Sequence, residues 1–162
     1  GALLAVSLWV MYVFHPFWQC YESNQCVQVK ISKSNLEIDP GTARDIALLR
    51  RLEGQYAPNG QSFVATPFWP GAYALFDRKS PMWAIYALWK RSDSFQKKEI
   101  ERIKVSKPGF VVIVDTLLDG QDKFLFRNTH PLINQYIVDN FDPVPVPSAP
   151  RYKIYKARNQ RR

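Results

Sequence analysis

The order of apolar and polar positions separates an apolar first segment from a longer region of mixed character. Residues 2–17 are apolar except for Ser7, His15 and Pro16. A membrane-spanning helix needs about 20 apolar residues, so this segment is slightly short for a complete span. It also lacks the basic flank and the small-residue cleavage site of a signal peptide. We interpret residues 1–19 as a transmembrane or membrane-proximal helix, and a buried core helix is the alternative.

The rest of the chain alternates between strand and helix patterns. Short apolar or alternating runs predict strands over residues 27–31, 62–66, 110–114 and 152–155. Apolar residues three and four positions apart predict helices over residues 43–52, 70–76, 95–105 and 131–140. This alternation predicts an α/β fold, with a small, mostly parallel sheet flanked by helices in three layers and preceded by the N-terminal membrane-type helix.

Individual residues further indicate the burial of one strand, the position of another in the sheet and the start of a helix. Residues 110–114 contain no polar side chain, which is typical of a strand buried on both faces of a parallel sheet. The prolines before residues 152–155 favour an edge position for that strand. Asp39 or Thr42 is expected to cap the helix that follows it.

We divide the chain into the helix at residues 1–19, an α/β domain at residues 20–157 and a basic tail at residues 158–162. Because the first residue is Gly, we expect a processed product or a piece of a longer protein.

Composition and charge narrow the classes of protein and partner. Hydrophobic residues make up 46% of the chain and aromatic residues 14%, which excludes a largely disordered protein. The net charge of +8 favours anionic partners such as nucleic acid, phosphorylated lipids or acidic headgroups, although dispersed charges can also serve solubility alone. The cations are not interleaved with aromatic residues as on a single-strand stacking platform, so we expect no nucleic-acid partner.

The two cysteines, Cys20 and Cys26, lie close together after the apolar segment. Their spacing fits neither a zinc pattern nor a C-x-x-C redox motif. A disulfide that closes a small loop here would place the domain in an oxidising compartment, outside the cytoplasm. Two free thiols are the alternative.

Familiar catalytic and cofactor motifs are missing from the sequence. It has no Gly-rich nucleotide loop and no G-x-S-x-G hydrolase elbow. Because His15 and His130 are the only histidines, a histidine-rich metal site is excluded, whereas a carboxylate-only site is not. We therefore expect no cofactor and no metal, and we identify no catalytic residue.

Residues 66–89 are rich in aromatic side chains and prolines. They follow the second predicted strand directly, and ligands of open α/β sheets usually bind at that edge. The rings of Trp69 and Tyr73 can stack on a sugar or on lipid, and Arg78 with Lys79 can reach a phosphate. Core packing combined with a docking surface is the alternative.

A second candidate site lies at the start of the helix predicted over residues 131–140. Arg127 and His130 precede this helix, and a helix N-terminus attracts anions through its free N–H groups and its dipole. A phosphate or a carboxylate is the ligand expected there. In the alternative, Thr129 or Asn128 only caps the helix.

Six segments follow one another along the chain. They are the exit helix, the helix over residues 39–52, the stretch SFVATPFWPGAYALFDRKSP, the strand KPGFVVIVD, the helix THPLINQYIVDNFDPV and the strand YKIYKAR. Their order and spacing resemble the C-terminal extracytoplasmic domain of GT-C superfamily membrane glycosyltransferases, the dolichyl-phosphate-mannose or protein mannosyltransferase-like enzymes. The resemblance covers most of the chain after Asp39, and no single motif in it is sharp.

The resemblance implies a parent protein that transfers a sugar from a polyprenyl-phosphate donor to a lipid-linked or protein acceptor. In that family the catalytic carboxylates lie in the first extracytoplasmic loop, which has no counterpart here. The chain would then be a non-catalytic accessory domain on the periplasmic side of the membrane, joined to the rest of a multi-span protein. It would assist the binding of an acceptor, a lipid-linked sugar or polyprenyl phosphate, with candidate contacts at Trp69, Tyr73, Arg78, Arg127 and His130.

The alternative function is a single-pass, membrane-anchored α/β module that binds an envelope component or a partner protein. The two hypotheses differ in what precedes residue 1. The glycosyltransferase domain requires further membrane spans there, whereas the module requires a start codon and a short basic flank.

Overall fold

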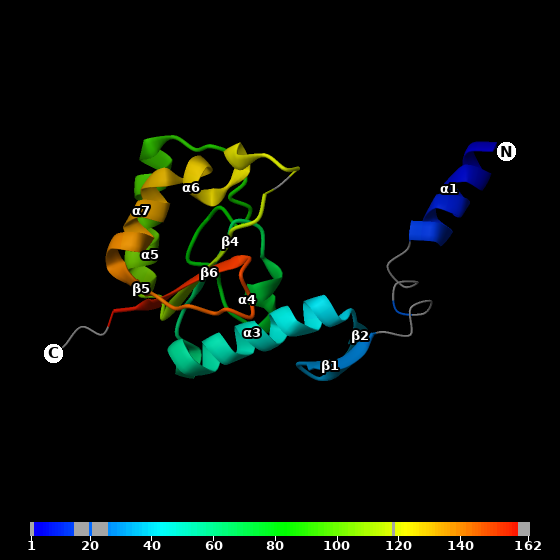
Figure 1. Cartoon of the computed structure of the whole chain (residues 1–162), viewed down its shortest axis with the longest axis horizontal. Coiled ribbons are helices and arrows are strands. Elements are labelled where there is room, and N and C mark those ends of the chain that lie inside the picture. Colours follow the sequence, from blue (N-terminus) through cyan, green and yellow to red (C-terminus); the bar gives the residue numbers. More distant parts are fainter. Residues whose placement is uncertain (1, 15–19, 21–25, 118, 159–162) are drawn as a thin grey trace. The chain divides into compact units, whose positions relative to one another are not determined.

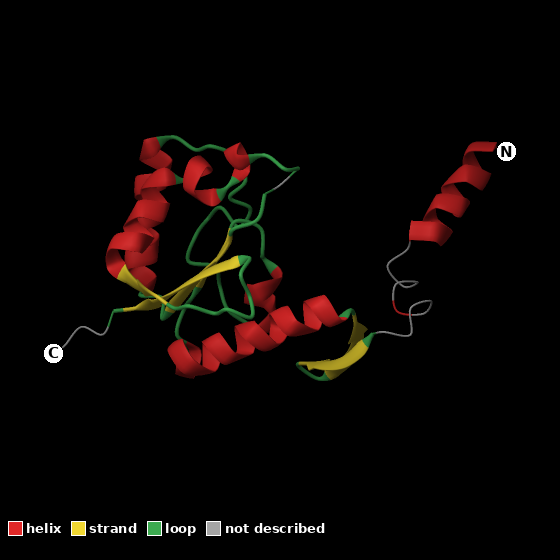
Figure 2. Cartoon of the chain, in the orientation of Figure 1, coloured by secondary structure: helices red, strands yellow, loops and turns green. Residues whose placement is uncertain are grey.

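The computed structural model describes residues 2–14, 20, 26–117 and 119–158 (Figures 1 and 2). The chain falls into two compact units, residues 1–49 and 50–162. Helices and strands alternate along it, which confirms the predicted α/β class. Residues 15–19 of the predicted membrane-type helix and residues 159–162 of the predicted basic tail lie outside the described part.

The first unit contains helix α1, Ala2–Phe14, and a hairpin of strands β1, Val27–Ile31, and β2, Ser34–Ile38. The sequence predicts β1 correctly but not β2. The hairpin pairs Val29 with Leu36, and most of its side chains are exposed, so β2 carries little of the alternation that reveals a half-buried strand. Within the described ranges, no helix is both long enough and apolar enough to cross a bilayer.

Helix α3, Pro40–Tyr56, is longer at both ends than its sequence pattern predicts. Asp39 caps its start, as predicted, because the carboxylate accepts the Thr42 N–H at 2.9 Å. Hydrogen bonds from Thr42 also hold the pKa of Asp39 below its ordinary value. Gly54 does not end the helix, because a helical glycine costs only about 1 kcal/mol and the neighbouring Leu52 is buried.

The second unit is built on a four-stranded sheet in the order β3-β4-β6-β5. Its strands are β3, Val64–Thr66, β4, Phe110–Val114, β5, Phe141–Pro143, and β6, Tyr152–Ala157. Only β3 and β4 are parallel, so the prediction of a mostly parallel sheet is wrong. The reason is the connection between β5 and β6, residues 144–151, which is shorter than the dozen or more residues that a parallel crossover needs.

The position of β6 also differs from the prediction. The prolines before this strand suggest an edge position, but β6 lies between β4 and β5 and pairs with both. These prolines belong to the connection and not to the strand, whereas Pro143 lies in β5, which does form an edge.

Helices cover both faces of this sheet (Figure 2). On one face, α5, Asp93–Ser106, and α7, Pro131–Asn140, pack against each other and over the strands. The core that they share contains Val64, Ile103, Val111, Ile113, Phe126, Ile133 and Ile137.

On the other face of the sheet, aromatic rings form a second packed layer. Phe63 stacks on Phe110 of β4 at 4.9 Å and on Tyr73 of α4, Gly71–Leu75, at 5.0 Å. Successive β4 side chains point to opposite faces, and all but Val114 are buried. The predicted burial of this strand on both faces is therefore confirmed, although its sheet is mixed.

Candidate functional site

A groove of about 540 Å³ lies where the ends of three segments of the second unit meet. We call it the basic groove, and its lining consists of Gly60, Gln61, Ser62, Arg78, Lys79, Ser80, Pro81, Ser106 and Lys107. The first three residues precede β3, the next four follow α4, and the last two end α5. The groove therefore joins residues that are up to 47 positions apart in the sequence.

Close backbone contacts hold the walls of the groove together. Lys107 ends α5 in a left-handed conformation, with a φ of 47°, and its carbonyl accepts the side-chain N–H of Gln61 at 3.1 Å. The Gly109 N–H donates to the Ser62 carbonyl at 2.8 Å. A Cβ at Gly109 would lie only 1.8 Å from the carbonyl oxygen of Tyr56, so this approach requires glycine.

Arg78 is held in a defined orientation at the groove. One guanidinium nitrogen donates to the Phe76 carbonyl at 2.9 Å, and another lies 3.6 Å from the carboxylate of Glu53. The guanidinium also packs against Gly60, which has a φ of +84°. The Arg78 side chain is 28% exposed, so part of its charge remains accessible to a ligand.

The lining of the groove is positively charged. It contains three cations, Arg78, Lys79 and Lys107, and no Asp or Glu. Glu53 partly balances Arg78, whereas within the described ranges neither lysine forms an ion pair. A groove with these cations attracts phosphate, carboxylate or sulfate groups, and the arginine fork can bind two oxygens of one such group.

A second groove, also of about 540 Å³, adjoins the first through Gln61 and Lys107. Its walls are mixed, with Ile103, Tyr136 and Phe141 beside the cations Lys104, Lys107 and Arg158. Its other cations are already paired, Lys104 with Glu101 at 2.8 Å and Arg158 with Asp142 at 3.0 Å. Within the described ranges, the first groove thus offers two lysines without an ion pair, and the second adds apolar side chains next to paired cations.

The predicted site residues do not come together around this groove. Arg78 lines it, together with the neighbouring Lys79, but Trp69, Tyr73, Arg127 and His130 are not in its lining. Tyr73 lies in the core, where its hydroxyl accepts the Ala65 N–H at 2.8 Å and donates to the Ala65 carbonyl at 3.2 Å. Burial raises the pKa of Tyr73 above its ordinary value.

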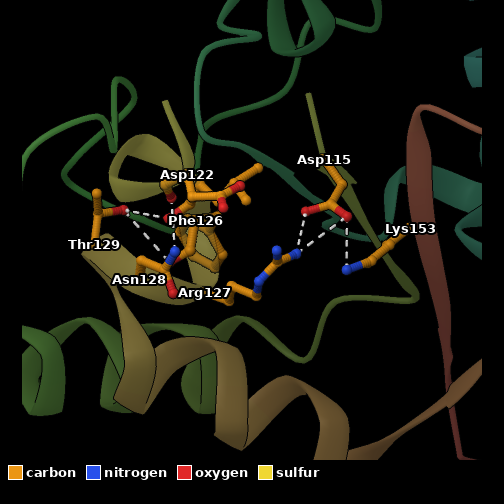
Figure 3. A network of polar contacts seen from close by, with 8 residues as sticks. Asp115, Asp122, Phe126, Arg127, Asn128, Thr129 and Lys153 are labelled. Atoms are coloured by element: carbon orange, nitrogen blue, oxygen red, sulfur yellow. Dashed lines mark hydrogen bonds and ion pairs between the residues drawn. The ribbon is translucent and has the colours of Figure 1, made fainter. Parts of the chain in front are cut away.

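Trp69 and Arg127 lie near the carboxyl ends of β3 and β4. The Trp69 ring stacks on Tyr152 at 5.1 Å. Arg127 faces Asp115 at 3.3 Å, and Asp115 also pairs with Lys153 at 2.6 Å (Figure 3). The cations of this network are thus directed at a carboxylate of the chain itself.

His130 is completely buried between α6, Phe126–Thr129, and α7. Its Nδ1 lies 2.9 Å from the Thr129 hydroxyl, and its ring stacks on Phe126. Burial, with a smaller contribution from the charge of Arg91, lowers the pKa of His130 to about 4. The imidazole is therefore neutral at pH 7 and is not exposed to a ligand in this conformation.

The start of α7 is not capped by Thr129 or Asn128, the two residues that the sequence suggests as its cap. Thr129 and Asn128 belong to α6, and neither side chain caps α7. Instead, the side-chain oxygen of Gln96 in α5 accepts the Leu132 N–H at 3.0 Å. Gln96 is buried and also donates to the Arg91 carbonyl, so the chain itself satisfies an N–H group that an anion would use.

The two cysteines belong to the first unit. Cys20 and Cys26 form a disulfide, and their Cα atoms lie 5.1 Å apart. Among the residues that the structure describes, no three His, Cys, Asp or Glu side chains are placed to hold a metal ion together.

The sequence does not indicate Lys107, Ser62 and Gln61 as components of a site. Lys107 is followed by Pro-Gly, which signals only the end of a helix, and no pattern links it to Lys79.

No family model matches this sequence, and comparisons with curated proteins and with solved structures give no match either.

Proposed function

We propose that the chain is a non-catalytic accessory domain of a polyprenyl-phosphate-sugar-dependent membrane glycosyltransferase, and that the basic groove binds the phosphate of a lipid carrier or of a lipid-linked acceptor. The observation that supports this proposal is the lining of the groove, in which Arg78, Lys79 and Lys107 meet without any Asp or Glu. The sequence resemblance supplies the enzyme class, and the groove supplies the ligand chemistry.

The charge arrangement favours a compact phosphate over a single carboxylate. The partly exposed guanidinium of Arg78 contributes one charge, and the ammonium groups of Lys79 and Lys107 add two further point charges. A phosphate has enough oxygens to engage several of these donors together, whereas a carboxylate has two. Because Arg78 is oriented by Phe76 and Glu53 before a ligand arrives, little of its side-chain freedom is lost on binding.

The adjoining groove suits the remainder of such a ligand. Tyr136 presents a ring there, and rings stack on sugar faces or pack against hydrocarbon. Phe141 and Ile103, both buried, lie behind this ring in the lining of the groove. We propose that a phosphate bound at Lys107 places the attached sugar or the first prenyl unit against Tyr136.

The test is binding of the full chain, reconstituted in nanodiscs of neutral lipid, to a polyprenyl phosphate and to the corresponding polyprenyl alcohol. The lysines Lys79 and Lys107 are changed to Gln together. At about 1 kcal/mol for each exposed charge contact, we expect the Kd for the phosphate to rise about thirtyfold. The alcohol, which lacks the phosphate, should bind weakly to both proteins.

The matched control is the variant with Lys97→Gln and Lys98→Gln. Both residues are exposed on α5 outside the groove, and the change in net charge is the same. The control should retain the affinity of the wild-type chain at physiological salt. An equal loss in both variants, or binding that disappears with salt in all three proteins, would show diffuse charge attraction and refute the groove as a phosphate site.

A further inference from the structure

The loop between α4 and α5 exposes an unusual number of large apolar side chains. We call residues 81–90 the aromatic loop. Of its side chains, Trp83 is 75% exposed, Trp89 63%, Tyr86 55% and Ile85 42%. Several large exposed apolar side chains in one loop of a folded domain indicate a surface that contacts another molecule or a membrane.

Buried side chains and backbone hydrogen bonds anchor the aromatic loop to the core, so its exposed rings are held at the surface. Met82 and Ala87 are buried within the loop. The carboxylate of Glu99, which is itself completely buried, accepts the N–H groups of Trp83 at 2.7 Å and of Ala84 at 3.2 Å. The Ala87 N–H donates to the Pro67 carbonyl at 2.7 Å. The backbone faces the core, and the large side chains point away from it.

Positive charge flanks the aromatic loop on both sides. Residues 78–92 contain four cations, Arg78, Lys79, Lys90 and Arg91, and no Asp or Glu, while Asp77 and Asp93 directly adjoin this range. The exposed Lys90 and Arg91 directly follow Trp89. The guanidinium carbon of Arg102 lies 4.9 Å from the centre of the Trp83 ring, so a further cation is placed beside this ring. Within residues 78–92 the sequence thus combines aromatic residues with cations, and cations outnumber the two bordering acidic residues.

We propose that the aromatic loop docks onto the surface of an anionic lipid bilayer. Trp and Tyr side chains partition to the membrane–water interface, where their apolar rings meet the acyl boundary and their polar groups meet water. Lys90 and Arg91 lie next to Trp89 and contact the lipid phosphates. A sugar would need more hydrogen-bond partners than the loop offers, because between residues 81 and 89 only the Tyr86 hydroxyl and the two indole N–H groups are polar side-chain groups.

The aromatic loop adjoins the basic groove, because Pro81 belongs to the loop and also lines the groove. None of Trp83, Tyr86, Trp89, Lys90 or Arg91 lines that groove, so docking through these side chains and phosphate binding can be tested separately. Replacing Lys79 and Lys107 should leave the docking unchanged, and replacing Lys90 and Arg91 should leave phosphate binding in the groove unchanged.

The experiment uses the full chain with Trp9, Trp18 and Trp69 replaced by Phe, so that only Trp83 and Trp89 fluoresce. Vesicles contain phosphatidylglycerol and phosphatidylcholine in a ratio of 3:7, with bromine on the acyl chains, and parallel vesicles contain phosphatidylcholine alone. On the anionic vesicles we expect a shift of the emission to shorter wavelength and a loss of intensity through bromine quenching. Because the readout comes from the loop itself, it is separate from any membrane binding of the apolar α1.

The charge contribution is tested by adding Lys90→Gln and Arg91→Gln to the same chain. From two cations near the surface, we expect the ratio of docked to undocked loop to fall about thirtyfold. The pair Lys97→Gln and Lys98→Gln, with the same change in charge, should retain docking.

Three results would overturn the proposal. One is equal accessibility of Trp83 and Trp89 to aqueous acrylamide with and without anionic vesicles. Another is equal quenching on the neutral vesicles, because no anionic headgroup would then be recognised. The third is shielding of both rings without lipid that rises with protein concentration, which would assign the loop to a contact between copies of the chain.

Discussion

The buried carboxylate of Glu99 is expected to be one of the largest single contributors to the stability of the second unit. It accepts the N–H groups of Trp83 and Ala84 and forms an ion pair with Arg102, while its own side chain is completely buried. Hydrogen bonds to a charged group contribute about 1.5–3 kcal/mol each. Removing the carboxylate leaves two backbone donors without their acceptor and an arginine without its partner.

We therefore expect Glu99→Ala to lower the free energy of unfolding by about 3–5 kcal/mol, the range for breaking a buried charged pair. Glu99→Gln keeps the size of the side chain and one accepting oxygen, so we expect a loss of about 2 kcal/mol. The measurement is urea unfolding followed by circular dichroism, with m-values compared to verify that the transition remains of the same kind.

The control for this prediction is Glu101→Gln, two residues along the same helix. Glu101 is exposed and pairs only with Lys104 in a pair three positions apart, which contributes about 0.5 kcal/mol or less. If Glu99→Gln and Glu101→Gln lower the stability equally, the reasoning from burial and hydrogen bonding is refuted. A loss below about 1 kcal/mol for Glu99→Ala would refute it as well.

Three further predictions concern glycine, histidine and glutamine. Gly109→Ala should lower the free energy of unfolding by more than about 3 kcal/mol, measured with denaturant, because the added Cβ would lie 1.8 Å from the Tyr56 oxygen. Gly54→Ala should raise it by about 0.5–1 kcal/mol, because no atom lies within 4 Å of the added Cβ. The pKa of His130 is lowered from 6.5 to about 4, so below pH 6.5 the unfolded chain binds a proton that the folded chain does not. The free energy of unfolding should therefore fall by about 3 kcal/mol as the pH drops from 7 to 4, and His130→Phe should abolish this pH-dependent loss. Gln96→Ala should cost about 2 kcal/mol through the unpaired Leu132 N–H, and an unchanged unfolding midpoint would contradict this.

Elements whose burial is encoded in local periodicity could be predicted from the sequence. The apolar run of β4 and the spacing of apolar residues in α5 and α7 gave these elements nearly their observed bounds. Strand β2 could not be found, because its side chains are mostly exposed and it therefore has no apolar face. Periodicity also carries no information on strand direction, which is why the antiparallel pairing of β6 was missed.

The candidate site could be predicted only in part, because a site is made by residues distant in sequence. Arg78 was identified with its neighbour Lys79, but its meeting with Lys107 depends on the tertiary fold. Tyr73 and His130 have the chemistry of binding residues, yet a hydrogen bond to Ala65 and complete burial place them in the core. The glycosyltransferase class, the periplasmic location and the lipid partner stay predictions.

The position of β6 inside the sheet has a consequence for synthesis of the protein. β6 follows all the other described strands in the chain, yet it fills the space between β4 and β5. While a ribosome is still producing residues before 152, β5 has no neighbour to pair with and β4 has an open hydrogen-bonding edge. Open edges of this kind invite pairing with other chains. The sheet can therefore close only after translation has passed Ala157, and until then the open edge of β4 stays available for pairing.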